Sequence, residues 1–413
     1  MITNDRQGGA TAYLRLLDPA VRADPYPVFA DIRATGAFRV ANSPVVVLSR
    51  YEDCAAMLRH PAASVERALS TLPLETLPAY DGPPGAPTSE AAPMFLFLDP
   101  PDHTRLRRLS TKAFTPRVVA QLQPRITEIV DALLDTALAA GTSDVVADFA
   151  YPLSVTVICE LLGVPLADEE RLGHWSSIVS RSLDPASRFA PQFRVDPREL
   201  QHAAADMYAY FEDLTRIRRT SPGSDLLSEL IAAEEAGDKL SHNELISICA
   251  LLLIAGHENT ANLIANAVLA LLRNREHLDA LRADPNLANA VVEETLRYDP
   301  PGQMVARIAA DDLEIGGIDI HRGDMVVLLF AAAHRDGSAF PDPDRFDPTR
   351  ASRHLAFGLG PHFCLGAPLA RLETAIALRR FAQRIESPRL RADPPPYRPH
   401  VNLRGPATML LEI

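Results

Sequence analysis

A cysteine set among glycines lies in the stretch HLAFGLGPHFCLGAPLARLE, residues 354–373. Cys364 comes two residues after His362, and an amphipathic run typical of a helix begins just after it. A sulfur at a helix N-terminus faces backbone N–H groups and the positive end of the helix dipole, which stabilise a thiolate. The thiolate is the form of cysteine that binds metals, so the pattern predicts a metal ligand. Three glycines free the backbone to curl around the sulfur: Gly358, Gly360 and Gly366.

The other three cysteines, Cys54, Cys159 and Cys249, lie in apolar helical contexts. A lone cysteine of this kind is most often a small buried hydrophobe. The sequence contains no CxxC pair, so it suggests neither a zinc site nor a disulfide framework, and it fits a reducing compartment.

Polar residues interrupt the apolar stretch ALLLIAGHENTANLI, residues 250–264. Glu258 and Asn259 bring polar groups into it, and Gly256 costs roughly 1 kcal/mol relative to alanine in a helix. Either a site requires the small residue and the polar groups, or the stretch is a kinked core helix with its polar side outward. The residues alone leave both interpretations open.

These two stretches need a large scaffold to position them. Apolar residues recur with a helical period over most of residues 104–297, most clearly at 243–274. Short β-branched runs occur near residues 44–50 and again within 306–330. No Gly/Ser linker, repeat or low-complexity tract divides the sequence, so we expect one large domain, residues 1–413, mainly α with a minor β-sheet.

Composition excludes several classes of function. The net charge of −12 and the pI near 5.5 argue against nucleic-acid binding, which needs a basic field. The N-terminus resembles neither a signal peptide nor a membrane span, and the longest apolar run, residues 246–256, is about half the length that crosses a bilayer. We therefore expect a soluble, cytoplasmic monomer that binds no membrane and no nucleic acid.

Two segments rich in Pro, Ser and Asp, residues 70–93 and 182–198, cannot form long helices. They are either solvated surface loops or a mobile lid over a pocket. The sequence does not decide between these two interpretations.

The pattern around Cys364 resembles a signature of the cytochrome P450 family, the haem-thiolate monooxygenases. Phe357, Gly360, Cys364 and Gly366 match F-x-x-G-x-x-x-C-x-G. The resemblance implies the fold of that family, haem b as the cofactor and Cys364 as the proximal ligand of the haem iron. Phe357 would shield the sulfur from water.

Haem propionates need cationic or hydrogen-bonding partners. Residues 99–117 resemble the family's C-helix and place His103 and Arg107 on one helical face. Arg307 and His362 match further propionate-binding positions. The resemblance implies that these four residues hold haem, although each taken alone would be interpreted as part of a solvated basic face.

Three residues are similar to the family's structural triad. Glu294 and Arg297 lie one helical turn apart in VVEETLRYDPP and resemble its E-x-x-R motif. The segment FPDPDRFDP, residues 340–348, resembles the later P-x-R-F segment, which adds Arg345 to the pair. The resemblance implies that the triad supports the cysteine loop and takes no part in catalysis.

The stretch around Gly256 resembles the family's distal helix, which has the pattern A/G-G-x-D/E-T. Ala255, Gly256 and Glu258 match it, and the two small residues would let a flat macrocycle approach. Asn259 stands where the pattern has threonine, and Thr260 follows it. This departure leaves open which of these three polar residues delivers protons during oxygen activation.

Four apolar residues are expected to line the substrate pocket: Leu251, Leu252, Ile254 and Met304. Parts of residues 70–98, 170–200 and 302–306 are expected to contribute as well. The apolar character of these residues indicates a greasy substrate without identifying it.

The resemblance predicts a bacterial-type monooxygenase that activates O₂ to hydroxylate or epoxidise an apolar organic molecule. A bacterial secondary metabolite such as a polyketide, macrolide or peptide is the favoured substrate. The unusual Asn259 keeps open an enzyme that uses peroxide or couples aromatic rings. A non-enzymatic haem-thiolate sensor is the other alternative, and Glu258 and the two loop segments argue against it.

Electrons from NAD(P)H are expected to arrive through a separate ferredoxin and its ferredoxin reductase, because the sequence ends soon after Cys364. Arg105, Arg108 and Lys112 share the expected C-helix, and Arg371 lies on the helix after the cysteine. They predict a local basic patch to which an acidic ferredoxin could bind.

Overall fold

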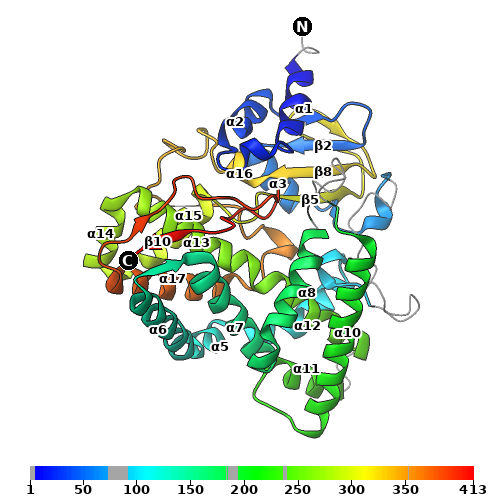
Figure 1. Cartoon of the computed structure of the whole chain (residues 1–413). Coiled ribbons are helices and arrows are strands. Elements are labelled where there is room, and N and C mark those ends of the chain that lie inside the picture. The colour runs from blue at the N-terminus through cyan, green and yellow to red at the C-terminus, as the bar shows by residue number, and fades with distance from the viewer. Residues whose placement is uncertain (1–4, 73–91, 183, 185–193, 236–239, 352) are drawn as a thin grey trace.

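The computed structural model describes residues 5–72, 92–182, 184, 194–235, 240–351 and 353–413. Helices make up most of it, with a sheet toward the N-terminal end (Figure 1). The α-helices are α1 (Asp5–Arg15), α2 (Tyr26–Thr35), α3 (Tyr51–Arg59), α4 (Asp102–Thr111), α5 (Pro116–Gln121), α6 (Gln123–Ala140), α7 (Tyr151–Leu162), α8 (Glu169–Ser182), α10 (Pro197–Thr220), α11 (Leu226–Glu235), α12 (His242–Gly256), α13 (Glu258–Arg273), α14 (Arg275–Ala283), α15 (Ala288–Tyr298), α16 (Phe330–Ala333) and α17 (Ala367–Arg384). The predicted class, mainly α with a minor sheet, is confirmed.

The strands come from distant parts of the sequence. They are β1 (Phe38–Arg39), β2 (Val45–Leu48), β3 (Ala63–Ser64), β4 (Thr142–Asp144), β5 (Met304–Ala309), β6 (Leu313–Ile315), β7 (Ile318–Ile320), β8 (Met325–Leu329), β9 (Arg389–Leu390) and β10 (Leu410–Glu412). The largest sheet has the order β1-β2-β8-β5-β3, in which β2 and β8 are parallel and the other neighbours antiparallel. It therefore joins the two β-branched runs of the sequence, which lie side by side in Figure 1.

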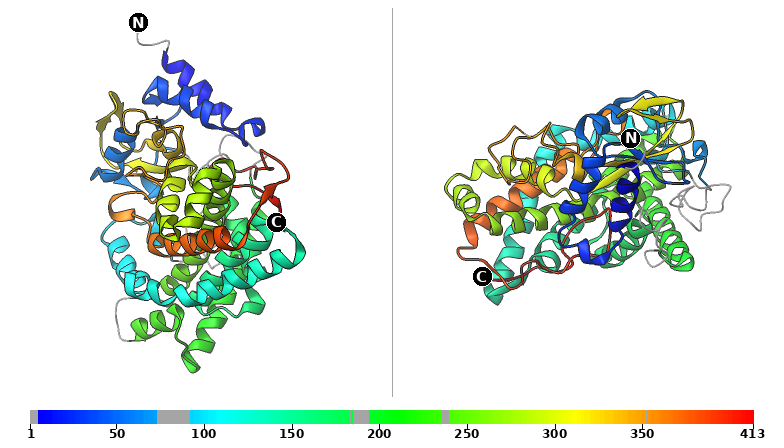
Figure 2. Two further views of the ribbon diagram at one scale, coloured as in Figure 1. Left: turned by 90° about the vertical axis from the view of Figure 1, so that its left-hand side faces the viewer. Right: turned by 90° about the horizontal axis from the view of Figure 1, so that it is seen from above.

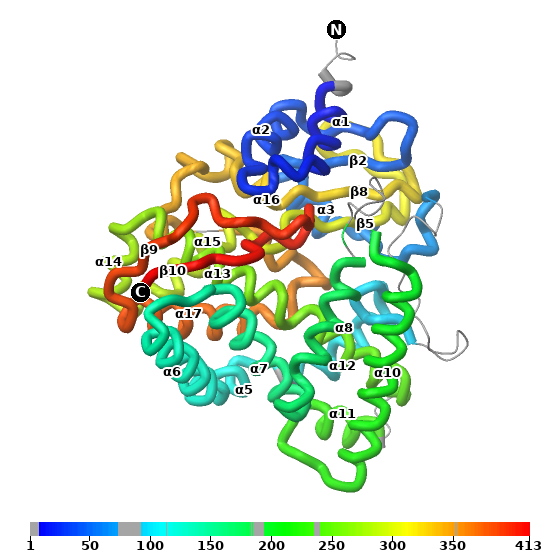
Figure 3. Tube along the Cα trace, viewed as in Figure 1, coloured from blue at the N-terminus to red at the C-terminus, as the bar shows by residue number. Residues whose placement is uncertain are grey.

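An apolar helical stretch, α12 and α13, crosses the helical part of the molecule (Figures 1 and 3). The sequence predicts a continuous helix over residues 243–274, but the helix breaks at His257. His257 Nδ1 lies 2.9 Å from the Leu253 carbonyl oxygen. Thr260 Oγ1 donates to the Gly256 carbonyl oxygen at 3.0 Å. Side chains that bind carbonyl groups one turn earlier bend a helix, which accounts for the break.

Two helical stretches, Val145–Leu162 and His242–Arg273, are long and apolar enough to cross a bilayer by length and composition alone. In their most apolar windows, 67% and 83% of the residues are buried inside the protein. Both stretches therefore form part of the protein core.

The C-terminal segment, residues 397–405, lies against the polar side of α13. Three polar residues recur at every fourth position of this helix: Glu258, Asn262 and Asn266. Asn266 Nδ2 donates to the Arg404 carbonyl oxygen at 3.3 Å, and Glu258 Oε1 lies 3.8 Å from Arg398 Nη1. These contacts hold α13 on its polar side.

Most of the two segments predicted as loops or a lid, residues 70–93 and 182–198, lies outside the described residues. Helix α8 ends at Ser182 and helix α10 begins at Pro197. Apart from these helix ends, the described residues of both segments (70–72, 92–93, 184 and 194–196) are not helical, in agreement with the prediction that neither segment forms a long helix.

The helix after Cys364, α17, is packed against α6, α13 and α15, as the views in Figure 2 show. On this helix Glu373 is 2% exposed, and its Oε1 accepts a hydrogen bond from Ser154 Oγ at 2.8 Å. Burial raises the pKa of the Glu373 carboxyl to about 8, and the hydrogen bond from Ser154 offsets only part of the lost hydration. Glu373 is therefore mostly protonated at neutral pH.

Glu373→Gln is expected to stabilise the protein in neutral and mildly alkaline solution. The native carboxyl keeps its proton up to about pH 8, whereas the unfolded chain loses it near the ordinary pKa of 4.5. The stability that this proton provides is full below the lower pKa and is lost as the pH rises through the higher one. The neutral amide avoids that loss, a gain on the order of 3 kcal/mol at pH 8.

Thermal unfolding at pH 5 and pH 8 measures this gain. Glu386→Gln changes an exposed carboxyl near the end of the same helix and is the control. An equal change in Tm at both pH values would contradict the assignment of a buried neutral carboxyl.

Candidate functional site

The loop before α17 fixes the backbone of Cys364. Its N–H donates to the Phe357 carbonyl oxygen at 2.8 Å. Gly360 has a φ of +71°, and a Cβ there would lie 2.9 Å from a backbone carbonyl oxygen of α3, so this close approach requires glycine. Gly358 also has a positive φ, of +68°. Gly366 does not need backbone freedom, because its φ is −79° and a Cβ would meet no atom within 4 Å.

Backbone N–H groups are directed at the Cys364 sulfur, as its position before a helix predicts. They belong to Gly366 and Ala367. Burial raises the pKa of the Cys364 thiol, while these hydrogen bonds and the guanidinium groups of Arg107 and Arg371 act in the opposite direction. As a residue Cys364 is exposed, and a metal bound to its sulfur would displace the thiol proton.

Four side chains that can carry positive charge lie together beside this loop: His103, Arg107, Arg307 and His362. The ring centroids of His103 and His362 are 4.1 Å apart. Burial lowers the pKa of all four groups, to about 10 for Arg307 and to about 3 for His362. The other three charges lower the pKa of His362 further. The structure thus brings together the four residues that the resemblance predicts.

The surroundings of this cluster fit an anionic group. Both ring nitrogens of His103 are buried without a hydrogen-bond partner among the described residues. Asp99, whose charge acts on His103 and Arg307, is bonded instead to Ser64 Oγ and to the N–H of Val65. Arg107 and Arg307 donate to carbonyl oxygens and have no carboxylate partner among the described residues, and the propionates of haem would supply the missing negative charge and hydrogen-bond acceptors.

Ala255 and Gly256, the two small residues at the end of α12, differ in their surroundings. Ala255 is exposed next to the buried Ile254, so its side of α12 is open. At Gly256 a Cβ would lie 2.8 Å from Ile158 Cγ1 on α7. The small size of Gly256 is therefore needed where α12 packs against α7, and its role in making room for a macrocycle stays a prediction.

The first residues of α13 place three kinds of polar group within one helical turn. Glu258 is 2% exposed and forms a loose ion pair with Arg398. Asn259 is half-buried, and its carboxamide has no hydrogen-bond partner among the described residues. Thr260 donates its hydroxyl proton to the Gly256 carbonyl oxygen. The acid is thus the group among them that can exchange a proton without breaking an existing hydrogen bond.

The predicted pocket residues fall into two groups. Leu251, Leu252 and Ile254 are between 4% and 7% exposed within the main apolar core. Met304 packs in a separate core, under the sheet. Since side chains alternate along β5, Met304 faces away from Arg307 and does not line a pocket on that side. Val305, which falls within the predicted pocket range 302–306, shares the face of Arg307 and is partly exposed.

The predicted pair Glu294 and Arg297 is buried on α15, with side chains 1% and 0% exposed. Arg297 donates to both carboxylate oxygens, at 2.7 and 2.8 Å. The prediction that the Arg345 side chain joins them is wrong, because Arg345 contributes its carbonyl oxygen, 2.9 Å from Arg297 Nη2, and its side chain is exposed. The guanidinium that reaches the carboxylate is that of Arg350, whose Nε lies 3.2 Å from Glu294 Oε1.

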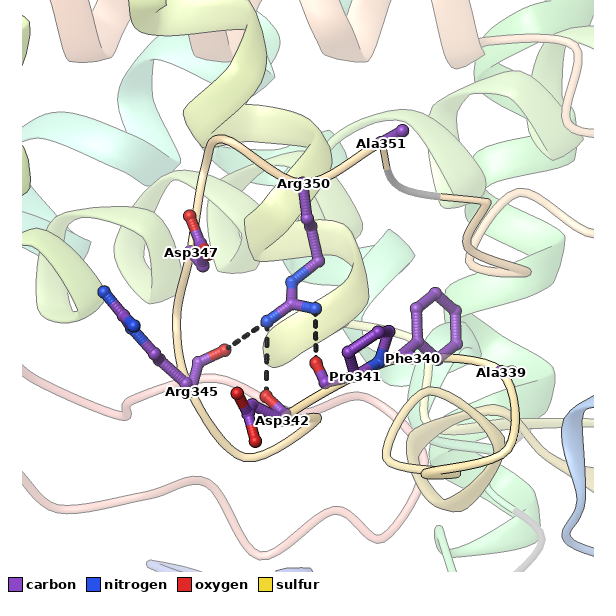
Figure 4. Close-up of a pocket in the computed structure, with 8 residues that line it drawn as sticks. All are labelled: Ala339, Phe340, Pro341, Asp342, Arg345, Asp347, Arg350 and Ala351. Carbon is purple, nitrogen blue, oxygen red and sulfur yellow. Dashed lines mark hydrogen bonds between the residues drawn. The ribbon is translucent and has the colours of Figure 1, made fainter.

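The loop that carries Arg350 is closed by this side chain (Figure 4). The guanidinium donates to the carbonyl oxygens of Pro341, Asp342 and Arg345 at 2.7, 3.2 and 3.4 Å. The loop lines a cavity of about 360 Å³. The lining comes from residues 339–351 and includes none of the described residues around Cys364, so this cavity is separate from the cysteine site.

The predicted basic patch is smaller in the structure. Arg105 Nη2 lies 2.6 Å from a carboxylate oxygen of α12, and Arg371 is paired with Glu293. Arg108 is exposed on α4, and Lys112 is exposed directly after it. Of the four residues in the predicted patch, Arg105 and Arg371 are thus paired with carboxylates, and the patch is reduced to Arg108 and Lys112.

Known proteins resemble the chain in sequence and in structure. The family model described as cytochrome P450 matches residues 37–410. The chain is 43% identical over 373 residues to the vitamin D(3) 25-hydroxylase of Pseudonocardia autotrophica, which covers 88% of this chain and 87% of that protein. It is 41% identical over 394 residues to the cytochrome P450 monooxygenase PikC of Streptomyces venezuelae, covering 92% and 89%. The ligand-free crystal structure of Mycobacterium smegmatis CYP164A2 is 46% identical, with a TM-score of 0.90 over 98% of this chain and 100% of that one.

These matches extend over nearly the whole chain and include both the cysteine loop and the distal helix. The cluster of cationic side chains and the buried ion pair on α15 lie within the same matched region. The chain therefore belongs to the cytochrome P450 family, and it is a monooxygenase whose cofactor is haem b.

Proposed function

We propose that the protein inserts oxygen from O₂ into an apolar organic molecule, by hydroxylation or epoxidation, with Cys364 as the ligand of the haem iron. The observation that carries the proposal is a cysteine, exposed as a residue, whose sulfur receives backbone N–H groups from the start of α17 and lies near a cluster of two arginines and two histidines. When bound there, haem supplies the activation of O₂. The protein works as a monomer in the bacterial cytoplasm.

The residues of the chain divide the task of holding haem. His103, Arg107, Arg307 and His362 bind the propionates, which relieves the cost of their burial. Ala255 leaves the distal side open. Phe357, whose carbonyl oxygen accepts the Cys364 N–H, limits the access of water to the sulfur.

The substrate in this proposal is an apolar secondary metabolite such as a polyketide, macrolide or peptide. Leu251, Leu252 and Ile254 offer no charged group to a ligand on the distal side. One relative is named for the hydroxylation of vitamin D(3), which supports an apolar substrate here.

Cys364→Ala is expected to abolish the strongly red-shifted Soret band of the reduced carbon monoxide complex, because that band reports thiolate ligation. Cys159→Ala changes a buried cysteine on α7 and should keep the band. Visible spectra, with Tm as a check on folding, measure the effect. A folded Cys364→Ala protein that retains the band would overturn the proposal.

We infer that a ferredoxin, reduced from NAD(P)H by its reductase, donates electrons at the exposed edge of α4. This helix adjoins the cysteine loop, because Arg107 donates to the Phe363 carbonyl oxygen. Arg108 is exposed on it, and Lys112 is exposed at the residue that follows it. An acidic partner would therefore approach close to the iron ligand.

Arg108→Glu is expected to slow reduction by ferredoxin about tenfold at low salt, because charge complementarity speeds encounter. The difference should shrink as salt rises, since the Debye length falls from about 10 Å at 0.1 M to about 3 Å at 1 M. Stopped-flow reduction measures both effects. Arg216→Glu makes the same charge change on the exposed side of α10 and is the control; a loss of rate equal to that control would refute docking at α4.

The proton needed for oxygen activation passes, in this proposal, through Glu258. A carboxamide donates and accepts hydrogen bonds but does not readily pass a proton on, which argues against Asn259. The hydroxyl of Thr260 is engaged with the Gly256 carbonyl oxygen. Glu258 lies next to the partly exposed Arg398, which links the buried acid to the surface.

Glu258→Gln is expected to slow turnover roughly tenfold or more, because a general acid is lost. Asn259→Ala is expected to lower the product formed per NADPH only modestly. The turnover rate and the product formed per NADPH are both measured with a compound that shifts the Soret band on binding. Tm is recorded in parallel. If Asn259→Ala abolished coupling at unchanged Tm while Glu258→Gln had no effect, the two roles would be reversed.

A further inference from the structure

The carboxylate of Glu293 binds residues on both sides of Cys364 in the sequence, His354 before it and Arg371 after it. It lies on α15 directly before Glu294 of the buried ion pair. Arg371, on α17 after the cysteine, donates from Nε to Glu293 Oε1 at 2.6 Å and from Nη2 to Oε2 at 3.0 Å. His354, at the start of the loop, has Nε2 3.2 Å from the same Oε2.

The hydrogen bonds of His354 show which group is the donor in its contact with Glu293. Its Nδ1 accepts the N–H of Ala356 at 3.2 Å, so Nε2 carries the proton that is donated to Glu293. Burial raises the pKa of the Glu293 carboxyl, but the hydrogen bonds from His354 and Arg371 outweigh burial and bring it to about 2. The carboxylate is therefore ionised throughout the neutral range.

A series of contacts leads from Glu293 through Phe357 to Cys364. The guanidinium carbon of Arg371 lies 4.6 Å from the centroid of the Phe357 ring, and the rings of His354 and Phe357 are 5.7 Å apart. The Phe357 carbonyl oxygen accepts the Cys364 N–H at 2.8 Å. Glu293 thus holds the two side chains that enclose Phe357, and Phe357 holds the backbone of the cysteine.

We propose that Glu293 is a positioning residue for the thiolate: by tying His354 to Arg371 it fixes Phe357 and keeps Cys364 bonded to iron. The inference rests on the proposed role of Cys364 as the haem ligand. It also gives Arg371 a task within the protein in place of the partner contact that the sequence predicts.

The pair contributes little to global stability. The side chains of Glu293 and Arg371 are 33% and 35% exposed, and ion pairs of that exposure are worth about 0 to 1 kcal/mol. A change at Glu293 should therefore act on the ligand and leave the rest of the fold nearly intact.

The same helix offers a matched control. Asp131 on α6 binds Arg380 of α17 through two hydrogen bonds of 2.7 Å, and these side chains are 29% and 34% exposed. Glu293→Gln and Asp131→Asn thus each remove one carboxylate that is paired with an arginine of α17, and Asp131 also lies 3.4 Å from Arg384 of that helix. Only Glu293 touches the cysteine loop.

The experiment follows the red-shifted Soret band of the dithionite-reduced carbon monoxide complex in moderate urea, without any ferredoxin. Glu293→Gln is expected to lose this band roughly fivefold faster than the unchanged protein, which corresponds to about 1 kcal/mol. Asp131→Asn should lose it at the unchanged rate. Both variants should keep a Tm within a few degrees of the unchanged protein.

A double variant tests whether Glu293 and Arg371 act through the same contact. Glu293→Gln combined with Arg371→Gln should lose the band no faster than either single variant, because both changes break one contact. Equal rates for Glu293→Gln and Asp131→Asn, or additive effects in the double variant, would overturn the inference. A red-shifted band that is missing from the unchanged protein would instead overturn the proposed ligation by Cys364.

Discussion

A buried ion pair is stable only if every charge in it is bonded, and the pair Glu294–Arg297 imposes that condition on its surroundings. Arg297 donates to the carbonyl oxygens of His334, Pro343 and Arg345 at 2.7 to 2.9 Å. The segment from 334 to 350 must therefore wrap around α15. Glu293, the preceding residue of the helix, binds the cysteine loop. One helix thus sets the path of the chain on both sides of the iron ligand.

Local spacing predicts much of this arrangement. The mainly α class and the position of Cys364 before a helix follow from residues that are close in the sequence. Arg345 and Arg350 show the limit, because they lie in the same short loop and only its backbone path selects the second. The register of β5 likewise decides that Val305, and not Met304, shares a face with the cationic cluster. Such choices depend on backbone geometry, which residue types do not reveal.

Contacts between distant segments leave no local signal. Glu293 looks like one more acid on an exposed helix until the fold places Arg371 beside it. Arg398 lies in a proline-rich stretch with no helical or strand pattern, yet it faces Glu258. Gly256 has a packing partner on α7 that the sequence does not reveal, because Ile158 lies far from it along the chain. The sequence thus indicates which residues are unusual, and the fold supplies their partners.

The last segment of the chain has a consequence for biosynthesis. Asn266 on α13 binds the carbonyl oxygen of Arg404, and β2 pairs with β8 from the second half of the sequence. A ribosome releases these partners long after α13 and β2 have emerged. Because contacts of such long sequence separation form late, these two parts of the core cannot be completed early in translation. The polar side of α13 and the edge of β2 therefore stay without these partners until residues 325–329 and 397–405 have left the ribosome.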